Sequence, residues 1–142
     1  VDDVESRYVL SGGNDAKICL YDLESKQLSD STAQQSDSGS LPTIVSPPIC
    51  STTRSSSTGH EFSVTSVFWY PNDSGAFISS ACDGKVLVWD TDLYEIAGCF
   101  QLNSKVYSAS MHTDGVNSLV LCATADKGIR LCDLSSGDCA HI

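Results

Sequence analysis

The stretch that decides the fold is "CDGKVLVWDT", residues 82–91. The pair Asp83-Gly84 is a tight-turn signal, and the short apolar run after it, which ends at Trp89-Asp90, is typical of a β-strand. Taken alone, the stretch has three explanations. It is one strand of an arbitrary sheet, an enzyme's carboxylate beside an aromatic wall, or one copy of a repeated unit.

Two further copies of the stretch identify it as a repeat. "DAKICLYD" (15–22), "DGKVLVWD" (83–90) and "DKGIRLCD" (126–133) all fit the pattern D-x-x-[IV]-x-[LV]-[WYC]-D. The last two copies are 43 positions apart, within the period of roughly 40–45 residues typical of a four-stranded propeller blade. The repeat therefore predicts blades of a β-propeller.

The first two copies are 68 positions apart, and a Ser/Pro-rich segment explains the excess. It contains ten serines, five threonines and three of the four prolines, a composition that cannot bury enough apolar surface to order itself. The sequence therefore predicts four parts of the chain. Residues 1–27 form the end of a first blade with its second and third strands, and residues 28–58 a flexible insertion with an edge strand at 41–50. Residues 59–100 form a complete blade, and residues 101–142 a third, degenerate blade.

Alternating apolar residues and turn signals, without a helical period, predict an all-β protein. We expect a partial propeller of about two and a half four-stranded blades, open rather than closed. Because the chain begins at Val1 and contains a single Met, we expect it to be an internal piece of a longer protein. An unclosed array exposes apolar surface and strand edges, which predicts poor solubility for the piece alone.

Charge and cysteine usage exclude several function classes. The net charge is -10 and the pI about 4.3, so we expect no direct nucleic-acid binding, which needs clustered basic residues. The chain has no apolar run long enough to span a membrane. The seven cysteines form no C-x-x-C pair and are expected to be reduced thiols. Only Cys139 and His141 approach a zinc-ligand spacing, so we expect no metal and no cofactor.

The middle repeat resembles the WD-repeat family of β-propellers. Gly59-His60 stands before the repeat, 29 positions ahead of Trp89, and Trp89-Asp90 ends it. The resemblance implies that a His, a Ser, the turn Asp and the Trp form a hydrogen-bonded chain within the blade. In this sequence the predicted structural tetrad is His60, Ser79, Asp83 and Trp89.

The other two repeats carry only partial tetrads. Ser11 and Asp15 match in the first repeat, where Tyr21 replaces the Trp. In the third repeat Asp126 matches. Cys122 replaces the Ser, and Cys132 replaces the Trp.

His60, Ser79 and Asp83 also supply the residue types of a Ser-His-Asp hydrolase. No G-x-S-x-G nucleophile elbow accompanies them, and the repeat itself accounts for all three residues. We therefore predict a structural role, no catalytic residue and no enzyme, with the hydrolase as a remote alternative.

Longer strings resemble one branch of the family, the Cockayne syndrome A-type WD-repeat proteins. They are "RYVLSGGNDAKICLYDLE" (7–24), "SVTSVFWYPNDSGAFISSACDGKVLVWDT" (63–91) and "LCDLSSGDCAHI" (131–142). The resemblance implies a nuclear, non-catalytic substrate receptor of a cullin–RING ubiquitin ligase in transcription-coupled nucleotide excision repair. The implied partners are a ligase adaptor of the damaged-DNA-binding type, a repair ATPase and the stalled RNA polymerase II machinery.

The W-D-x-R form common in adaptor-binding repeats does not occur here. Thr91-Asp92 follows Trp89-Asp90, and Leu134-Ser135 follows Cys132-Asp133. A WD-repeat scaffold of an unrelated nuclear or cytoplasmic complex is therefore the alternative hypothesis.

Partner contacts in propellers come mostly from loops and blade faces. The residues predicted to face partners are Glu61, Phe62, Asn72, Asp73, Lys105 and Tyr107. Ser46-Pro47 is a candidate for proline-directed phosphorylation, which would add charge within the Ser-rich insertion.

Overall fold

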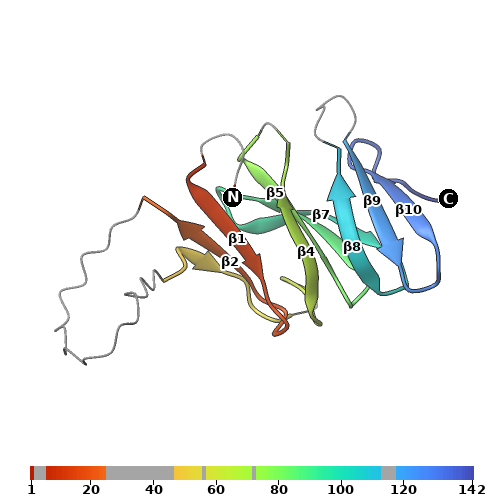
Figure 1. The fold of residues 1–142 in the computed structure, drawn as a ribbon, viewed down its shortest axis with the longest axis horizontal. Coiled ribbons are helices and arrows are strands. Elements are labelled where there is room, and N and C mark those ends of the chain that lie inside the picture. The colour runs from red at the N-terminus through yellow and green to blue at the C-terminus, as the bar shows by residue number, and fades with distance from the viewer. Residues whose placement is uncertain (2–5, 25–46, 56, 72, 113–117) are drawn as a thin grey trace, which may run out of the picture.

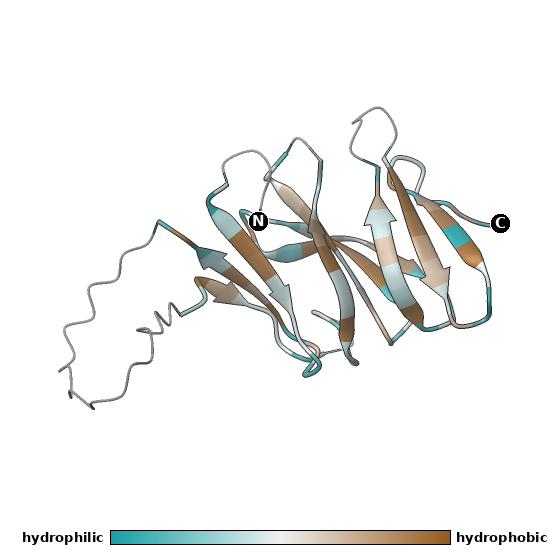
Figure 2. Cartoon of the chain, in the orientation of Figure 1, coloured by the Kyte–Doolittle hydropathy of each residue, from teal (hydrophilic) through white to brown (hydrophobic). Residues whose placement is uncertain are grey.

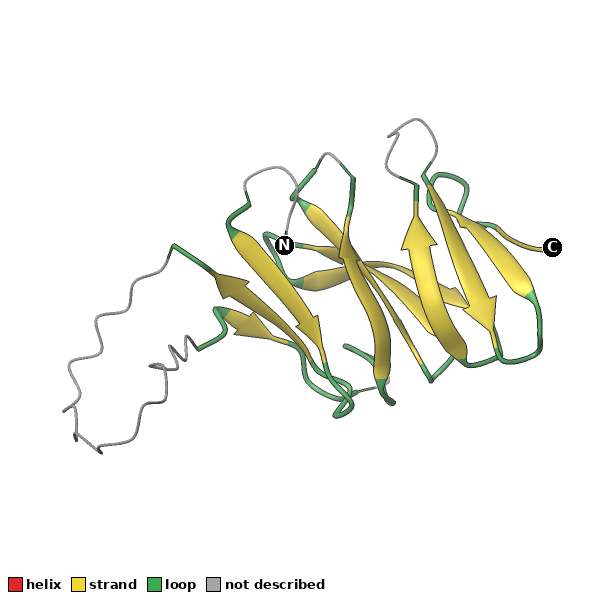
Figure 3. Ribbon diagram, viewed as in Figure 1, coloured by secondary structure: helices red, strands yellow, loops and turns green. Residues whose placement is uncertain are grey.

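The computed structural model describes residues 1, 6–24, 47–55, 57–71, 73–112 and 118–142. These residues form strands, turns and loops, with no helix (Figure 3). The all-β prediction is confirmed. The described residues contain no helix long and apolar enough to cross a membrane.

The middle sheet contains the quoted stretch. Its strands are β4 (Val64–Trp69), β5 (Ala76–Ala81), β6 (Lys85–Asp90) and β7 (Glu95–Gln101), paired antiparallel in the order β4-β5-β6-β7. Gly84 in the β5–β6 turn has a φ of 78°, in the left-handed region that glycine enters at no steric cost. The β4–β5 register shifts between Val64 and Ser66, a β-bulge or similar irregularity at the start of β4.

The third sheet repeats this order. Its strands are β8 (Val106–Met111), β9 (Leu119–Thr124), β10 (Ile129–Asp133) and β11 (Cys139–His141), ordered β11-β10-β9-β8. Cys132 lies opposite Cys139 in β10 and β11, just as Trp89 lies opposite Ile96 in β6 and β7. The 43-residue period of the sequence is therefore also the period of the strand pairing.

The first sheet has one strand more than the two expected for the first repeat. Its strands are β1 (Tyr8–Gly12), β2 (Ile18–Asp22) and β3 (Cys50–Ser51), in the order β1-β2-β3. The short β3 lies at the edge, where the Ile18 N–H also donates to Thr52 Oγ1 at 2.9 Å. Of the edge strand predicted at 41–50, only Cys50 lies in β3, and residues 41–46 lie outside the described residues.

The three sheets stand side by side, with β4 between β1 and β8 (Figure 1). They do not close into a ring in the described part of the chain. Apolar residues colour much of the strands brown in Figure 2. Their side chains pack between neighbouring sheets in two clusters. One cluster joins the first and middle sheets through Ile18, Phe77, Leu87 and Trp89. A second joins the middle and third sheets through residues that include Ile78, Val86, Val120 and Cys122.

A hydrogen-bonded chain in the middle sheet and the surfaces around it

Four segments of the middle repeat converge on one buried polar chain. His60 lies in the loop before β4, Ser79 on β5, Asp83 in the β5–β6 turn and Trp89 on β6. The side chains of His60 and Ser79 are fully buried, and Trp89 is 1% exposed. The structure therefore brings together all four residues of the tetrad predicted for this repeat.

The hydrogen-bonded chain runs from the indole of Trp89 to the carboxylate of Asp83 through three hydrogen bonds. Trp89 Nε1–H donates to Ser79 Oγ at 2.8 Å, and Ser79 Oγ lies 2.8 Å from His60 Nε2. His60 Nδ1 lies 2.9 Å from Asp83 Oδ2. Because the carboxylate only accepts, Nδ1 carries the proton and Nε2 accepts from the serine hydroxyl. Every polar group in the chain is thereby satisfied.

The Asp83 carboxylate ends this hydrogen-bonded chain and accepts hydrogen bonds from three donors, of which His60 is one. Its Oδ2 also accepts the backbone N–H of Glu61 at 3.0 Å, and Oδ1 accepts that of Lys85 at 2.9 Å. Burial acts to raise the pKa of the Asp83 carboxyl. The hydrogen bonds from His60, Lys85 and Glu61 outweigh this effect, so the pKa lies below its usual range. The charged carboxylate is thus stabilised where it joins the His60 loop to the turn.

Asp83, His60 and Ser79 are hydrogen-bonded in the same order as the residues of a catalytic triad. Whether a substrate can reach the serine therefore distinguishes a catalytic role from a structural one. Ser79 and His60 are both fully buried, and the Trp89 indole N–H occupies the serine oxygen that would have to attack a substrate. No substrate carbonyl can approach this oxygen in the observed packing. The geometry therefore favours a structural role over the hydrolase alternative.

The Trp89 ring packs against two other aromatic rings, those of Phe77 and Tyr94. It stacks on Phe77 at a centroid distance of 5.6 Å and an interplanar angle of 7°. Tyr94 lies 6.2 Å from it and donates its hydroxyl to the Ile18 carbonyl at 3.1 Å, across to the first sheet. This aromatic cluster was not predicted from the sequence, although aromatic residues facing one another on paired strands are a usable signal.

The third repeat replaces the polar chain with thiols and a surface ion pair. Cys122 and Cys132 are buried, in contact with each other, at the positions of Ser79 and Trp89. Asp126 lacks the histidine of the middle repeat, because Asn103 stands at the position that corresponds to His60. The hydrogen bond from Thr124 and that from Arg130 instead lower the pKa of Asp126 to about 2.

In the first repeat the two residues that match tetrad positions lie at the surface. Ser11 and Asp15 are both exposed, and Asp15 accepts the Lys17 backbone N–H at 3.3 Å. The first repeat has a bidentate ion pair elsewhere, which was not predicted from the sequence. Arg7 donates from Nε and Nη2 to the Asp22 carboxylate at 2.9 and 2.6 Å.

The described residues predicted to face partners lie at two ends of the middle sheet and at the start of the third sheet. Phe62 is 54% exposed at the end that holds His60, and Glu61 beside it forms an ion pair with Lys85 at 3.4 Å. Lys105 is exposed before β8, one repeat period after Phe62, and the β8 residue Tyr107 is 62% exposed. Asp73 is exposed in the β4–β5 turn, at the opposite end. Asn72 and Ser46 lie outside the described residues.

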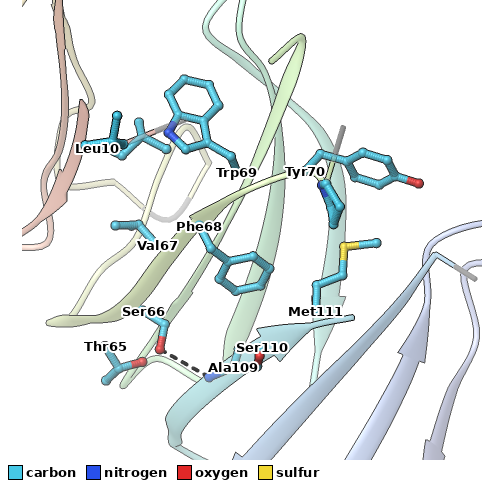
Figure 4. A pocket seen from close by; sticks show the side chains of 12 residues that line it. Leu10, Thr65, Ser66, Val67, Phe68, Trp69, Tyr70, Ala109, Ser110 and Met111 are labelled. Atoms are coloured by element: carbon cyan, nitrogen blue, oxygen red, sulfur yellow. Dashed lines mark hydrogen bonds between the residues drawn. The ribbon is translucent and has the colours of Figure 1, made fainter. Parts of the chain in front are cut away.

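A groove of about 590 Å³ runs between β1, β4 and β8 (Figure 4). At its floor the Ala109 backbone N–H donates to Ser66 Oγ at 3.2 Å, which ties β8 to β4. The side chains of Leu10, Trp69 and Met111 line the groove.

Comparison with known proteins agrees with this architecture. The family model described as "WD domain, G-beta repeat" matches residues 51–90. The WD40 domain of Toxoplasma gondii coronin aligns with a TM-score of 0.73 at 20% identity, covering 99% of this chain and 32% of that one. The β-propeller domain of Cps50 (Swd1) from Myceliophteria thermophila aligns with a TM-score of 0.69 at 16% identity, covering 97% and 34%. At these identities the two structures show the fold alone.

Sequence relatives point in the same direction. WD repeat-containing protein ATCSA-1 of Arabidopsis thaliana is 32% identical over 99% of this chain. Radiation-sensitive protein 28 of Saccharomyces cerevisiae is 31% identical over 53% of the chain. A ribosome biogenesis protein WDR12 homolog of Drosophila mojavensis is 27% identical over 87%. The chain spans 30% of ATCSA-1, 15% of Radiation-sensitive protein 28 and 26% of the WDR12 homolog.

The repeated four-stranded sheets, the buried tetrad and these likenesses support the WD40 repeat family and the β-propeller fold for this chain. WD40 propellers are generally non-catalytic scaffolds that mediate protein–protein interactions. Within the family, the likeness to ATCSA-1 extends over almost the whole chain.

Proposed function

We propose that this chain belongs to a nuclear substrate receptor of a cullin–RING ubiquitin ligase that acts in transcription-coupled nucleotide excision repair. In this proposal the sheets catalyse nothing and present surfaces to partner proteins. The partners are a ligase adaptor of the damaged-DNA-binding type, a repair ATPase and the stalled RNA polymerase II machinery.

One observation carries the proposal, the 32% identity to ATCSA-1 over 99% of the chain. The alignment covers 99% of this chain, so it includes all three repeats rather than the middle repeat alone. The name of a second relative, Radiation-sensitive protein 28, agrees with a role in the response to DNA damage.

The burial of the polar chain supports a scaffold role. His60, Ser79 and Trp89 are each no more than 1% exposed, so the residues with the most distinctive chemistry cannot touch a partner. The same loop that buries His60 exposes Phe62, over which Arg54 lies at 5.9 Å from the ring centroid. An exposed aromatic ring with an arginine on its face is a composition enriched at protein interfaces.

A second candidate is a WD-repeat scaffold in ribosome biogenesis. It is favoured by the WDR12 homolog of Drosophila mojavensis, which is 27% identical over 87% of the chain. This candidate shares the fold and the non-catalytic role and differs only in the partners.

Reconstitution with purified components separates the two candidates. The full-length protein would be immobilised and offered the ligase adaptor, the repair ATPase and a set of ribosome assembly factors in separate binding reactions. Binding of the adaptor and the ATPase supports the proposal. Binding of ribosome assembly factors alone supports the second candidate, and binding of neither repair partner overturns the proposal.

Two variants at opposite ends of the middle sheet locate the contact. Phe62→Ala removes the exposed ring beside the buried tetrad, whereas Asp73→Ala changes the exposed turn at the other end. We expect Phe62→Ala to weaken ATPase binding about tenfold, the effect of roughly 1.4 kcal/mol. Asp73→Ala should bind like the wild type.

A further inference from the structure

The third sheet contains a feature that a scaffold role does not require, a cluster of three cysteines. Cys122 on β9, Cys132 on β10 and Cys139 on β11 occupy adjacent strands. Cys122 and Cys132 are fully buried, and Cys139 is exposed. The Sγ atoms of Cys132 and Cys139 are 2.9 Å apart.

The middle sheet shows what these positions normally hold. Ser79, Trp89 and Ile96 are the repeat equivalents of Cys122, Cys132 and Cys139, and Trp89 lies opposite Ile96 in the β6–β7 ladder. There the serine hydroxyl and the indole N–H form part of the tetrad. The third sheet has lost that polar chain and has thiols in its place.

The strand pairing suits a covalent link between Cys132 and Cys139. The two residues are directly opposite, and the adjacent Asp133–Asp138 pair carries the ladder hydrogen bond, from the Asp133 N–H to the Asp138 carbonyl at 2.8 Å. Cys132 and Cys139 therefore form a non-hydrogen-bonded pair, in which Cα atoms are about 4.5 Å apart. Disulfides span Cα separations of about 4.4–6.8 Å, so side-chain rotation is enough to close the bond.

We propose that Cys132 and Cys139 are a modification site, at which a small-molecule disulfide such as glutathione disulfide converts the two thiols into an intrachain disulfide. The exposed Cys139 thiolate attacks one sulfur of glutathione disulfide, forms a mixed disulfide and releases one glutathione thiolate. The Cys132 thiolate then attacks the Cys139 sulfur and releases the second glutathione. Two cysteines are oxidised, one glutathione disulfide is reduced to two thiols, and the two protons from the cysteines pass to the glutathione thiolates.

The burial pattern assigns the order of these steps. Of the three cysteines of this sheet named above, only Cys139 is exposed to a solute, and Cys132 lies against it with the two Sγ atoms 2.9 Å apart. Burial raises the pKa of the Cys139 thiol to about 12, which lowers the thiolate fraction and slows the first step without changing the equilibrium. Reactions with glutathione must therefore be run to equilibrium rather than scored after minutes.

The test uses the full-length protein in glutathione buffers that range from fully reduced to fully oxidised. After equilibration, free thiols are alkylated and the protein is cleaved before aspartates, which separates Cys132 from Cys139 because Asp133 and Asp138 lie between them. A cross-linked pair of peptides, reverting to two alkylated peptides in reduced buffer, is the expected result. Its fraction should follow the ratio of glutathione disulfide to the square of glutathione.

Two variants provide the comparison. Cys139→Ser should abolish the cross-link and leave Cys132 unmodified by glutathione, since it is buried. Cys99→Ser, which removes an exposed thiol on β7 of the middle sheet, should form the Cys132–Cys139 cross-link as the wild type does. The proposal is overturned if Cys139 stops at the glutathione mixed disulfide, or if both thiols stay open to alkylation in fully oxidised buffer.

Discussion

Replacing Asp83 with alanine tests whether the buried chain stabilises the middle sheet. The carboxylate accepts three hydrogen bonds, from His60 Nδ1 at 2.9 Å, from the Glu61 N–H at 3.0 Å and from the Lys85 N–H at 2.9 Å. Alanine removes both acceptor oxygens and with them all three hydrogen bonds. The imidazole N–H of His60 then loses its acceptor, and water does not replace it because the His60 side chain is fully buried.

The expected loss follows from these contacts. A buried donor left without a partner costs roughly 1–3 kcal/mol, and bonds to a charged acceptor lie at the upper end. The two backbone N–H groups border the surface turn, where water replaces part of what they lose. We therefore expect Asp83→Ala to lower the free energy of unfolding by about 3 kcal/mol. Asp83→Asn should give an intermediate loss, because it retains a single acceptor oxygen.

Urea unfolding of the full-length protein, followed by tryptophan fluorescence and circular dichroism, measures the effect. With slopes of roughly 1–3 kcal/mol per molar urea, a loss of about 3 kcal/mol should lower the midpoint by about 1–3 M. Asp126→Ala is the matched control, since Asp126 holds the same repeat position without a histidine at the place of His60. Equal losses for Asp83→Ala and Asp126→Ala, or a change under about 0.5 kcal/mol for Asp83→Ala, would refute the reasoning.

Two further predictions concern glycine and pH. Gly84→Ala should destabilise more than Gly137→Ala in thermal melts, by roughly 1–3 kcal/mol. Both residues have φ near 77–78°, but a Cβ at Gly84 would stand 2.9 Å from the Ser104 carbonyl oxygen and a Cβ at Gly137 meets nothing within 4 Å; equal losses would contradict this steric explanation. The second prediction rests on the lowered pKa of Asp83, whose ordinary value is 3.8. Its stabilisation is fully present above about pH 5 and is lost as pH falls through 3.8 towards the folded-state pKa. Urea midpoints between about pH 7 and pH 3 should therefore fall more steeply for the wild type than for Asp83→Asn, and parallel slopes would count against this.

The repeat made the fold and one polar chain predictable. The period of 43 residues between Asp90 and Asp133 required the same strand order twice. The WD-repeat resemblance proposed His60 and Ser79 as partners, and the structure places them 2.8 Å apart. Such prediction works because each tetrad residue has a fixed offset from a turn or a strand end.

Features that depend on contacts between repeats were not predictable in this way. The bond from the Tyr94 hydroxyl to the Ile18 carbonyl joins residues 76 positions apart on different sheets, and no spacing within one repeat encodes it. The bounds of β3 were also not predictable. An edge strand was predicted at 41–50, but β3 spans only Cys50–Ser51, and two residues of a Ser/Thr-rich segment carry too little alternation to fix a strand. The partner-facing residues could be placed only as loop positions.

The two hydrophobic clusters lie on opposite faces of the middle sheet, one centred on Phe77 and Trp89 and the other on Ile78 and Val86. Adjacent residues of one strand thus belong to different cores. Substitutions in the first sheet and in the third sheet share no packing neighbour within these two clusters, so their energetic effects should sum. Of the three described sheets, only the middle one contributes to both clusters. A substitution in the first sheet can therefore affect the packing of the third sheet only through the strands of the middle sheet.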